Sequence, residues 1–291
     1  MRARVGTVAE ADAATPSAKG DAIDLAFPST APARIAAIAD LVPPCRVVCE
    51  VGYDRGLILW TLLGARPDVR AIGVEIQPAS ATATPIPGPL AGRVELRTGD
   101  GLLPIVPGEV DGVILAGLGG RTIVGVLESC PDVVARLDFV VTCPSHLEAD
   151  VRPALLRLGL GIADERIVFD RGRYYEVVVA RPLRRRLAEL ALPALPALPA
   201  LPALPALSAL PAHAGAVDLA ACDEVAAAWG PLLLARDPLM ADYLDDHERR
   251  FHAAFASGLA SYRDGAKAAL GRKLALLSEA RQRLGSRPLL G

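Results

Sequence analysis

The chain has 291 residues, of which 52% are hydrophobic and 22% are charged, and its formal net charge at pH 7 is -2. This composition is typical of a folded globular protein and excludes a chain that stays unfolded through low hydrophobicity and high charge. The near-neutral balance gives no overall sign of a nucleic-acid binder, although an average can hide a local basic patch.

The N-terminus lacks a basic start followed by a continuous apolar run, so we expect no signal peptide. The most apolar stretch, residues 190–212, carries proline at nearly every third position. Proline removes helix donors, so we expect no membrane-spanning helix there and no membrane partner. The five cysteines form no Cys-x-x-Cys pair, which predicts reduced thiols, no metal site and a cytoplasmic protein.

Four regions follow one another along the chain. Residues 1–29 have little periodicity and are interpreted as a mobile tail, and residues 30–182 form the predicted α/β domain. Residues 183–217 are a Pro/Leu/Ala-rich linker, because a three-residue repeat with proline favours an extended polyproline-like segment. Residues 218–291 are predicted to be a helical C-terminal domain.

Within the α/β domain, short apolar runs alternate with helical segments. Residues 33–42 have the apolar spacing of a helix, which the prolines at 43 and 44 end. Continuous, β-branched strands between helices favour a parallel sheet covered on both faces. We predict strands at 46–52, 69–76, 94–98, 111–116 and 137–143, helices near 56–65, 120–128 and 146–158, and a terminal antiparallel hairpin of 163–169 with 173–181. This order resembles the Rossmann-like sheet of class I methyltransferases.

The C-terminal region carries a local basic excess. Residues 248–287 contain nine Arg or Lys and three Asp or Glu. Such a run predicts a nucleic-acid contact. A solvated helix face without a ligand is the alternative interpretation.

Acidic and small residues follow the first three predicted strands. Glu50 ends the first strand, and Gly52 lets a ligand lie against the backbone next to a helix start. Glu75, at the end of the second strand, can accept hydrogen bonds from ribose hydroxyls. Asp100 in the segment GDGL can accept from an adenine amino group, with the amide of Gly101 beside the ring. Ordinary turn chemistry and a surface carboxylate are the alternatives at these positions.

The fourth and fifth strands end in two further loops. The fourth strand leads into AGLGG, residues 116–120, where three glycines in four positions bring the backbone close to a ligand or to a neighbouring element. The fifth strand leads into TCPSH, residues 142–146. We interpret the first loop as a wall beside a reacting methyl group and the second as part of a target pocket. Close packing of a helix on a strand is the alternative for the glycines.

Taken in order, these segments resemble the bacterial tRNA (adenine-22-N1)-methyltransferase family. The matching segments are residues 50–55, 99–102, 116–120, 143–144 and 175–177, and the helix at 33–42 is also similar to that family's first helix. The likeness covers about residues 33–182, and a weaker one extends over 225–285. The resemblance implies S-adenosyl-L-methionine as cofactor and tRNA as partner, bound through the Arg-rich helices at 249–287, with N1-methyladenosine as product.

The resemblance also implies roles for individual residues. Asp54 is the candidate catalytic residue, because its carboxylate can accept from the target N6 amino group. The expected cofactor-binding residues are Glu50, Gly52, Glu75, Asp100, Gly101, Ala116 and Gly117. The expected substrate-binding residues are Tyr53, which can stack on the base, Arg55, which can contact a phosphate, and Leu118, Gly119, Gly120, Cys143, Pro144 and Tyr175.

The chain departs from the family pattern at several of these positions. Glu50 stands in place of Asp, and Tyr53 and Arg55 flank Asp54 in place of Ser and His. Leu118 replaces Met, Cys143 replaces Gln, and a proline-rich stretch at 78–89 replaces a helix. Two alternatives therefore stay open: a methyltransferase of the same fold that acts on another RNA or a small molecule, and an inactive binding protein.

Overall fold

The structure, a computed structural model, describes residues 31–77, 85–146, 150–183, 223–256 and 264–285. The tail predicted for residues 1–29 lies outside the described residues, as does the linker predicted for 183–217 except for its first residue. No helix in the described ranges is long and apolar enough to cross a membrane.

A seven-stranded sheet forms the centre of the molecule, in the order β3-β2-β1-β4-β5-β7-β6. Strands β1 to β5 are parallel, and β7 runs antiparallel to both β5 and β6. This arrangement confirms the predicted Rossmann-like fold with a terminal hairpin. The strands are β1 (Val47–Val51), β2 (Arg70–Glu75), β3 (Val94–Thr98), β4 (Gly112–Ala116), β5 (Phe139–Cys143), β6 (Leu160–Asp170) and β7 (Arg173–Pro182).

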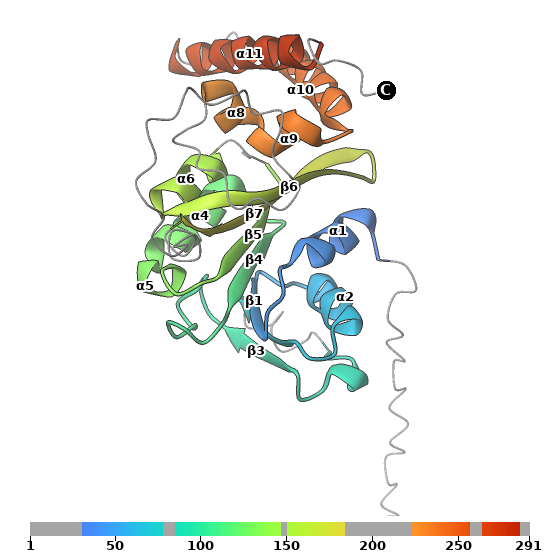
Figure 1. The fold of residues 1–291 in the computed structure, drawn as a ribbon, viewed down its shortest axis with the longest axis vertical. Coiled ribbons are helices and arrows are strands. Elements are labelled where there is room, and N and C mark those ends of the chain that lie inside the picture. The colour runs from blue at the N-terminus through green and yellow to red at the C-terminus, as the bar shows by residue number, and fades with distance from the viewer. Residues whose placement is uncertain (1–30, 78–84, 147–149, 184–222, 257–263, 286–291) are drawn as a thin grey trace, which may run out of the picture.

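Helices cover both faces of this sheet (Figure 1). One face carries α1 (Ala33–Leu41) and α2 (Leu57–Ala65), and the other carries α4 (Gly120–Ser129), α5 (Pro131–Val134) and α6 (Val151–Arg157). The chain between β2 and β3 contains the short 3-10 turn η1 (Gly88–Leu90). The predicted helix at 146–158 is shorter than expected within the described residues, because α6 begins only at Val151.

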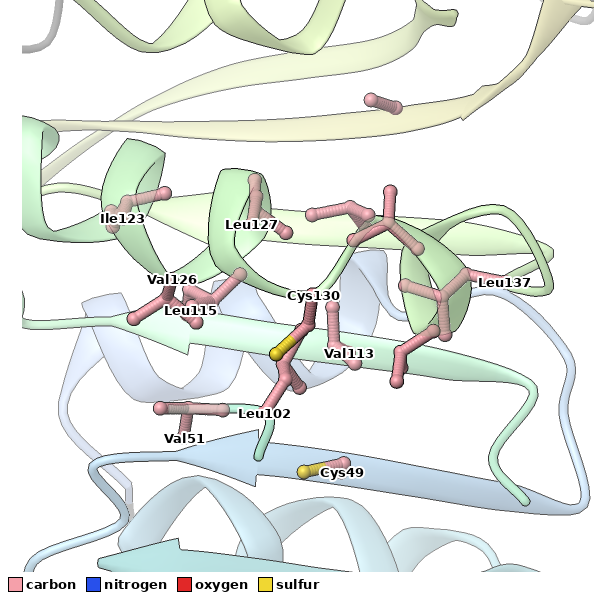
Figure 2. Close-up of a cluster of buried hydrophobic side chains, with 14 of the residues drawn as sticks. Cys49, Val51, Leu102, Val113, Leu115, Ile123, Val126, Leu127, Cys130 and Leu137 are labelled. Carbon is pink, nitrogen blue, oxygen red and sulfur yellow. The ribbon is translucent and has the colours of Figure 1, made fainter. Parts of the chain in front are cut away.

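Alternation along the strands divides the core into two apolar layers. Cys49 and Val51 of β1 point to the α4 face, whereas Val48 points to the α1 face. Figure 2 shows Leu115 of β4 and Leu127 of α4 in the same cluster as Cys49 and Val51. Because both layers are apolar, the parallel strands are continuous hydrophobic runs in the sequence.

Four helices of the C-terminal region pack against the hairpin side of the sheet (Figure 1). They are α8 (Glu224–Trp229), α9 (Pro231–Arg236), α10 (Met240–Ala256) and α11 (Asp264–Gly285). Gly230 adopts φ 89°, and the proline that follows begins α9, so the chain turns sharply between α8 and α9. Apolar residues of these helices bury Ile167 of β6, so the region shares a core with the sheet.

A buried polar network joins the C-terminal helices to the sheet. The Arg152 guanidinium of α6 lies 2.7 Å from Glu165 of β6 and 2.8 Å from Glu176 of β7. The Tyr243 hydroxyl of α10 donates a hydrogen bond of 2.5 Å to Glu176. All four side chains are almost fully buried. The network therefore fixes α10 against the hairpin.

Candidate functional site

A cavity of about 220 Å³ opens at the carboxyl ends of β1 and β4. These two strands are neighbours in the sheet, and their connections leave in opposite directions. In open α/β sheets such a switch point is where ligands bind. The lining residues come from α1, from the loop after β1 and the start of α2, and from the loop after β4: Arg34, Ile35, Glu50, Gly52, Tyr53, Asp54, Arg55, Leu57, Ile58, Ala116, Gly117 and Leu118.

The loop after β1 is shaped by two glycines in left-handed conformations. Gly52 has φ 73° and Gly56 has φ 70°. A Cβ at Gly56 would lie 2.4 Å from ring carbons of Trp60, so only glycine fits at this helix start. The Gly52 N–H donates to the Val74 carbonyl oxygen at 2.8 Å, which ties the loop to β2. Both glycines therefore shape the turn into α2, and Gly52 also lines the cavity.

Glu50 is a buried carboxylate at the floor of the cavity. It is 3% exposed, and its Oε2 atom has no hydrogen-bond partner in the described structure. Burial raises the pKa of Glu50 well above its usual range, and the charge of Asp54 acts in the same direction, while the Leu59 backbone N–H opposes the shift. A buried carboxyl group that lines a cavity and has an oxygen without a partner is suited to a cationic ligand group.

Tyr53 is in a different position from the one that base stacking requires. Its side chain is 2% exposed, and its ring packs over Gly73 of β2, where an added Cβ would come within 2.7 Å of the ring. The absence of a side chain at Gly73 creates the space that the ring fills. Tyr53 therefore lines the cavity as part of the core beneath the loop, with its ring largely covered by protein.

Asp54 and Arg55 stand at the mouth of the cavity. Their side chains are 79% and 77% exposed, and the Arg55 Nε atom lies 3.7 Å from the Asp54 carboxylate. Asp54 has φ 48°, a left-handed conformation that is uncommon for residues other than glycine, asparagine and aspartate. The exposed carboxylate is therefore accessible to a substrate that enters from solvent.

Glu75 and Asp100 continue the site toward β2 and β3. Glu75 ends β2 half-buried, and its Oε1 atom accepts from the Gln77 N–H at 3.2 Å. The Gly99 N–H donates to the Glu75 carbonyl oxygen at 3.0 Å, which places the exposed Asp100 beside the end of β2. Gly101 adopts φ 56° against Val126 of α4. Both carboxylates thus lie at the same edge of the sheet as Glu50, outside the lining of the cavity itself.

The loops after β4 and β5 hold each other. Gly117 donates to the Cys143 carbonyl oxygen at 3.0 Å, and Gly120 donates to the His146 carbonyl oxygen at 2.8 Å. A Cβ at Gly119 would lie 2.7 Å from the His146 ring. Ala116, Gly117 and Leu118 line the cavity, whereas Gly119 and Gly120 begin α4 against the second loop.

Three predicted substrate contacts are covered by protein. Cys143 is fully buried and Pro144 is buried beside it, so neither side chain reaches the cavity. Tyr175 is half-buried, and the Arg34 guanidinium lies over its ring at 4.9 Å from the centroid. These residues support the walls of the site and do not line it.

Two further residues at this edge were missed by the sequence reasoning. Arg34 of α1 lines the cavity and makes no ion pair or side-chain hydrogen bond with the rest of the described chain. Ile76 follows Glu75 and is 59% exposed, unusual for a large apolar side chain. The only sequence signal for Ile76 is its position after an acidic strand end, and α1 gave no signal that distinguishes Arg34 from a solvated helix residue.

The basic excess of the C-terminal helices is mostly neutralised. Arg250 pairs with Asp246, Arg281 pairs with Asp245, and Arg283 pairs with Asp223. Arg272 and Lys273 are exposed and make no ion pair within the described ranges. The partners lie upstream of the basic run, which explains why counting charges over 248–287 overstated the free positive charge. In the described part of the chain, no three His, Cys, Asp or Glu side chains gather as a metal site requires.

Residues 31–178 match the family model described as a methyltransferase domain. The tRNA (adenine(22)-N(1))-methyltransferase of Bacillus subtilis (strain 168) is 28% identical over 150 residues, which are 50% of this chain and 63% of the relative. The matched part thus spans less than two thirds of that relative.

Two solved structures share the fold across most of both chains. The B. subtilis M1A22 tRNA methyltransferase TrmK has a TM-score of 0.63 and 20% identity, with 86% of this chain and 98% of that chain covered. The M. capricolum TrmK, in complex with S-adenosyl-homocysteine, has a TM-score of 0.59 and 11% identity, with 86% and 97% covered. The C-terminal helices are therefore included in the shared architecture.

Proposed function

The chain belongs to the methyltransferase-domain family, and we propose that it transfers a methyl group from S-adenosyl-L-methionine to N1 of an adenine in tRNA. The cavity at the switch point, with the partnerless buried oxygen of Glu50 at its floor, is the observation that carries the proposal. The tRNA adenine is suggested by the name of the B. subtilis relative, which the chain matches over 150 residues.

The residues at this edge of the sheet fit the cofactor. Glu50 would hold the α-ammonium of the methionyl end, with the unpaired guanidinium of Arg34 available to its carboxylate. Glu75 would accept from the ribose hydroxyls. The exposed Ile76 would cover one face of the adenine, and Asp100 would accept from its amino group. When bound, S-adenosyl-L-methionine supplies an electrophilic methyl group on a sulfonium.

The substrate side needs positioning more than proton transfer. The adenine N1 lone pair is already nucleophilic, so no strong general base is required. As N1 gains the methyl group, the adenine becomes cationic. Asp54, exposed at the mouth of the cavity, would accept a hydrogen bond from the N6 amino group and stabilise that charge. Leu118, half-buried against Gly52, would close the opposite side.

The substrate base must leave its stack to reach this cavity, which costs a few kcal/mol. Contacts to the RNA backbone outside the cavity would offset that cost. Within the C-terminal helices, Arg272 and Lys273 are the unpaired basic side chains of the described residues, and we assign tRNA contact to this part of 249–287. The cytoplasm is the location that follows from a tRNA substrate.

Two measurements on the full chain test the proposal. Calorimetric titration with S-adenosyl-homocysteine should give saturable binding, and a labelled methyl group should be transferred to an unmodified tRNA transcript. A matched transcript with guanine in place of the adenine at position 22 should accept no label. Binding without transfer to any tRNA would leave a methyltransferase of the same fold with another substrate. A chain that binds no cofactor would be an inactive member.

A further inference from the structure

We propose that the tip of the β6–β7 hairpin, through Arg171 and Arg173, binds RNA phosphates next to the target nucleotide. The inference rests on the proposed function, because it assigns a docking surface to that substrate. The sequence predicts RNA contacts in the C-terminal helices, whereas its pattern marks the hairpin only as the end of the sheet.

The hairpin extends beyond the edge of the sheet that carries the cavity. Thr142 of β5 lies opposite Val178 of β7, and β5 ends one residue later. Because β7 is antiparallel, its earlier residues continue past the carboxyl ends of the parallel strands. Each strand residue adds about 3.3 Å, so Arg173 lies roughly 7 Å beyond Tyr175. In Figure 1 the hairpin reaches past the sheet on the side of α1.

The strand alternation directs Arg173 toward the cavity side. Side chains two residues apart in a strand share a face, so Arg173 lies on the same face as Tyr175. The Tyr175 ring supports the guanidinium of Arg34, which lines the cavity. Two guanidinium groups therefore follow one another from the hairpin tip to the cavity.

The backbone of the turn at the tip is strained, because its first residue is not one of the types that favour a positive φ. Arg171 has φ 50° and Gly172 has φ 77°. Two-residue hairpin turns with positive φ at both positions prefer Asn-Gly or Gly-Gly, and a long side chain at the first position is unfavourable. The chain nevertheless has arginine there. Such strain is common at binding sites, where the side chain has a role outside the fold.

The two arginines also lack protein partners. Both are exposed, and neither makes an ion pair or a side-chain hydrogen bond with any residue in the described ranges. Asp170, opposite Arg173 in the register, is the acidic residue of the turn, and the nearby Arg166 is paired with Asp40. By contrast, Arg250, Arg281 and Arg283 of the C-terminal helices are paired with carboxylates. The free charge at the tip is therefore complementary to a polyanion that enters the cavity from this side.

The hairpin is held firmly enough to position such a contact. On its other face, the Phe169 and Tyr174 rings lie 4.7 Å apart, and Tyr174 continues to Tyr243 of α10 at 6.2 Å. The hairpin is thus packed against the C-terminal helices on one face, with Arg173 on the other face and Arg171 at the tip.

The test uses the double variant Arg171→Asn/Arg173→Gln in the full chain. Asparagine accepts the left-handed conformation, so the turn is retained and the melting temperature should not fall. The control is Arg136→Gln, which removes an exposed arginine between α5 and β5, at the opposite edge of the sheet. The dissociation constant for a tRNA transcript is measured by filter binding across a series of KCl concentrations.

We expect the double variant to bind tRNA about tenfold more weakly and to reduce the slope of log affinity against log salt by about one to two. The KM for tRNA should rise by a similar factor, while kcat and the affinity for S-adenosyl-homocysteine stay unchanged. The control should match the wild type in every measurement. If the double variant unfolds, Arg173→Gln alone should still lower the slope by about one.

An unchanged affinity and salt slope in the hairpin variants, in an enzyme that methylates tRNA normally, would overturn the hairpin assignment alone. The assignment would also be overturned if the double variant and Arg136→Gln lost the same amount of tRNA affinity. Saturable binding of S-adenosyl-homocysteine with no affinity for tRNA in the wild type would overturn the proposed substrate and the hairpin contact together.

Discussion

At the scale of single residues, the proposed function depends on the Glu50 carboxylate, whose burial costs free energy unless a ligand pairs with it. Glu50 is almost fully buried, and one of its oxygens has no hydrogen-bond partner in the described structure. Burying an ionised carboxylate costs several kcal/mol unless it is paired. In the proposed function, a cationic ligand group would supply the missing partner, so cofactor binding would remove a free-energy cost that the apo protein carries.

Glu50→Gln should separate these two states. The variant should bind S-adenosyl-homocysteine about 10- to 100-fold more weakly, because a hydrogen bond to a charged group contributes about 1.5–3 kcal/mol. Calorimetry measures this loss, with Glu128→Gln, an exposed carboxylate far from the cavity, as the matched control. Equal cofactor affinity in both variants would remove Glu50 from the cofactor site.

The same substitution should change the pH dependence of stability. Burial raises the folded-state pKa of Glu50, so its favourable contribution is fully present below the unfolded pKa. That contribution is lost as the pH rises through the raised, folded pKa. The apo wild type should therefore lose stability from mildly acidic to alkaline pH, and Glu50→Gln should lack this part of the loss. Urea unfolding at a series of pH values measures the difference.

Asp54 is the residue for which activity and cofactor binding should separate. Asp54→Asn keeps a side chain that tolerates the left-handed backbone, and it removes the charge that would stabilise a cationic base. We expect single-turnover methyl transfer to fall about 10- to 100-fold, with affinity for S-adenosyl-homocysteine changed less than about threefold. Asp54→Ala should lose at least as much activity. Unchanged turnover in both variants would contradict the role of this carboxylate.

At the scale of elements, the sheet could be predicted and the walls of the site could not. Continuous β-branched runs marked β1, β4 and β5, because strands buried on both faces need them. Strand β6 begins at Leu160, earlier than the predicted 163, because Leu160 and Gly161 also pair with β7. The burial of Tyr53 depends on the missing side chain of Gly73 on the neighbouring strand, a long-range contact that local pattern does not reveal.

The Arg34 guanidinium is another feature that required the tertiary structure. The sequence of α1 reads as an amphipathic helix, and only its packing against β7 brings Arg34 over Tyr175 and into the cavity. The position of the Glu176 carboxylate also required the tertiary structure, but here the structure places the residue outside the site. Its segment resembles a family motif, and the structure places Glu176 in the buried network with Arg152 and Tyr243, away from the cavity.

Arg152→Met tests whether this network holds the elements together. Removing the cation leaves Glu165 and Glu176 buried without their partner, which should lower the free energy of unfolding by about 3–5 kcal/mol. The control Arg157→Met breaks the exposed pair with Glu128 and should cost less than about 1 kcal/mol. Urea denaturation measures both values. Equal, small losses would mean that apolar packing alone fixes the C-terminal helices to the hairpin.

At the scale of the whole molecule, the carboxyl edge of the sheet collects the functional groups. The cavity lies at the ends of β1 and β4, and Glu75 and Asp100 follow toward β3. The hairpin and the C-terminal helices lie on the other side of the sheet (Figure 1). The periodicity of apolar residues along the chain predicted the division into an α/β part and a helical part. The sequence did not predict that Asp245 and Glu248 of α10 neutralise Arg281 of α11, because the paired residues are far apart in sequence.

Nucleoside mass spectrometry of tRNA tests the central assignment most directly. Total tRNA is isolated from cells with the gene, without it, and with the Asp54→Asn variant in its place, and the N1-methyladenosine content is measured. The proposed function predicts N1-methyladenosine at the adenine-22 position in the first sample and its loss from the second, with little recovery by the variant. An identical N1-methyladenosine content at that position with and without the gene would contradict the assignment.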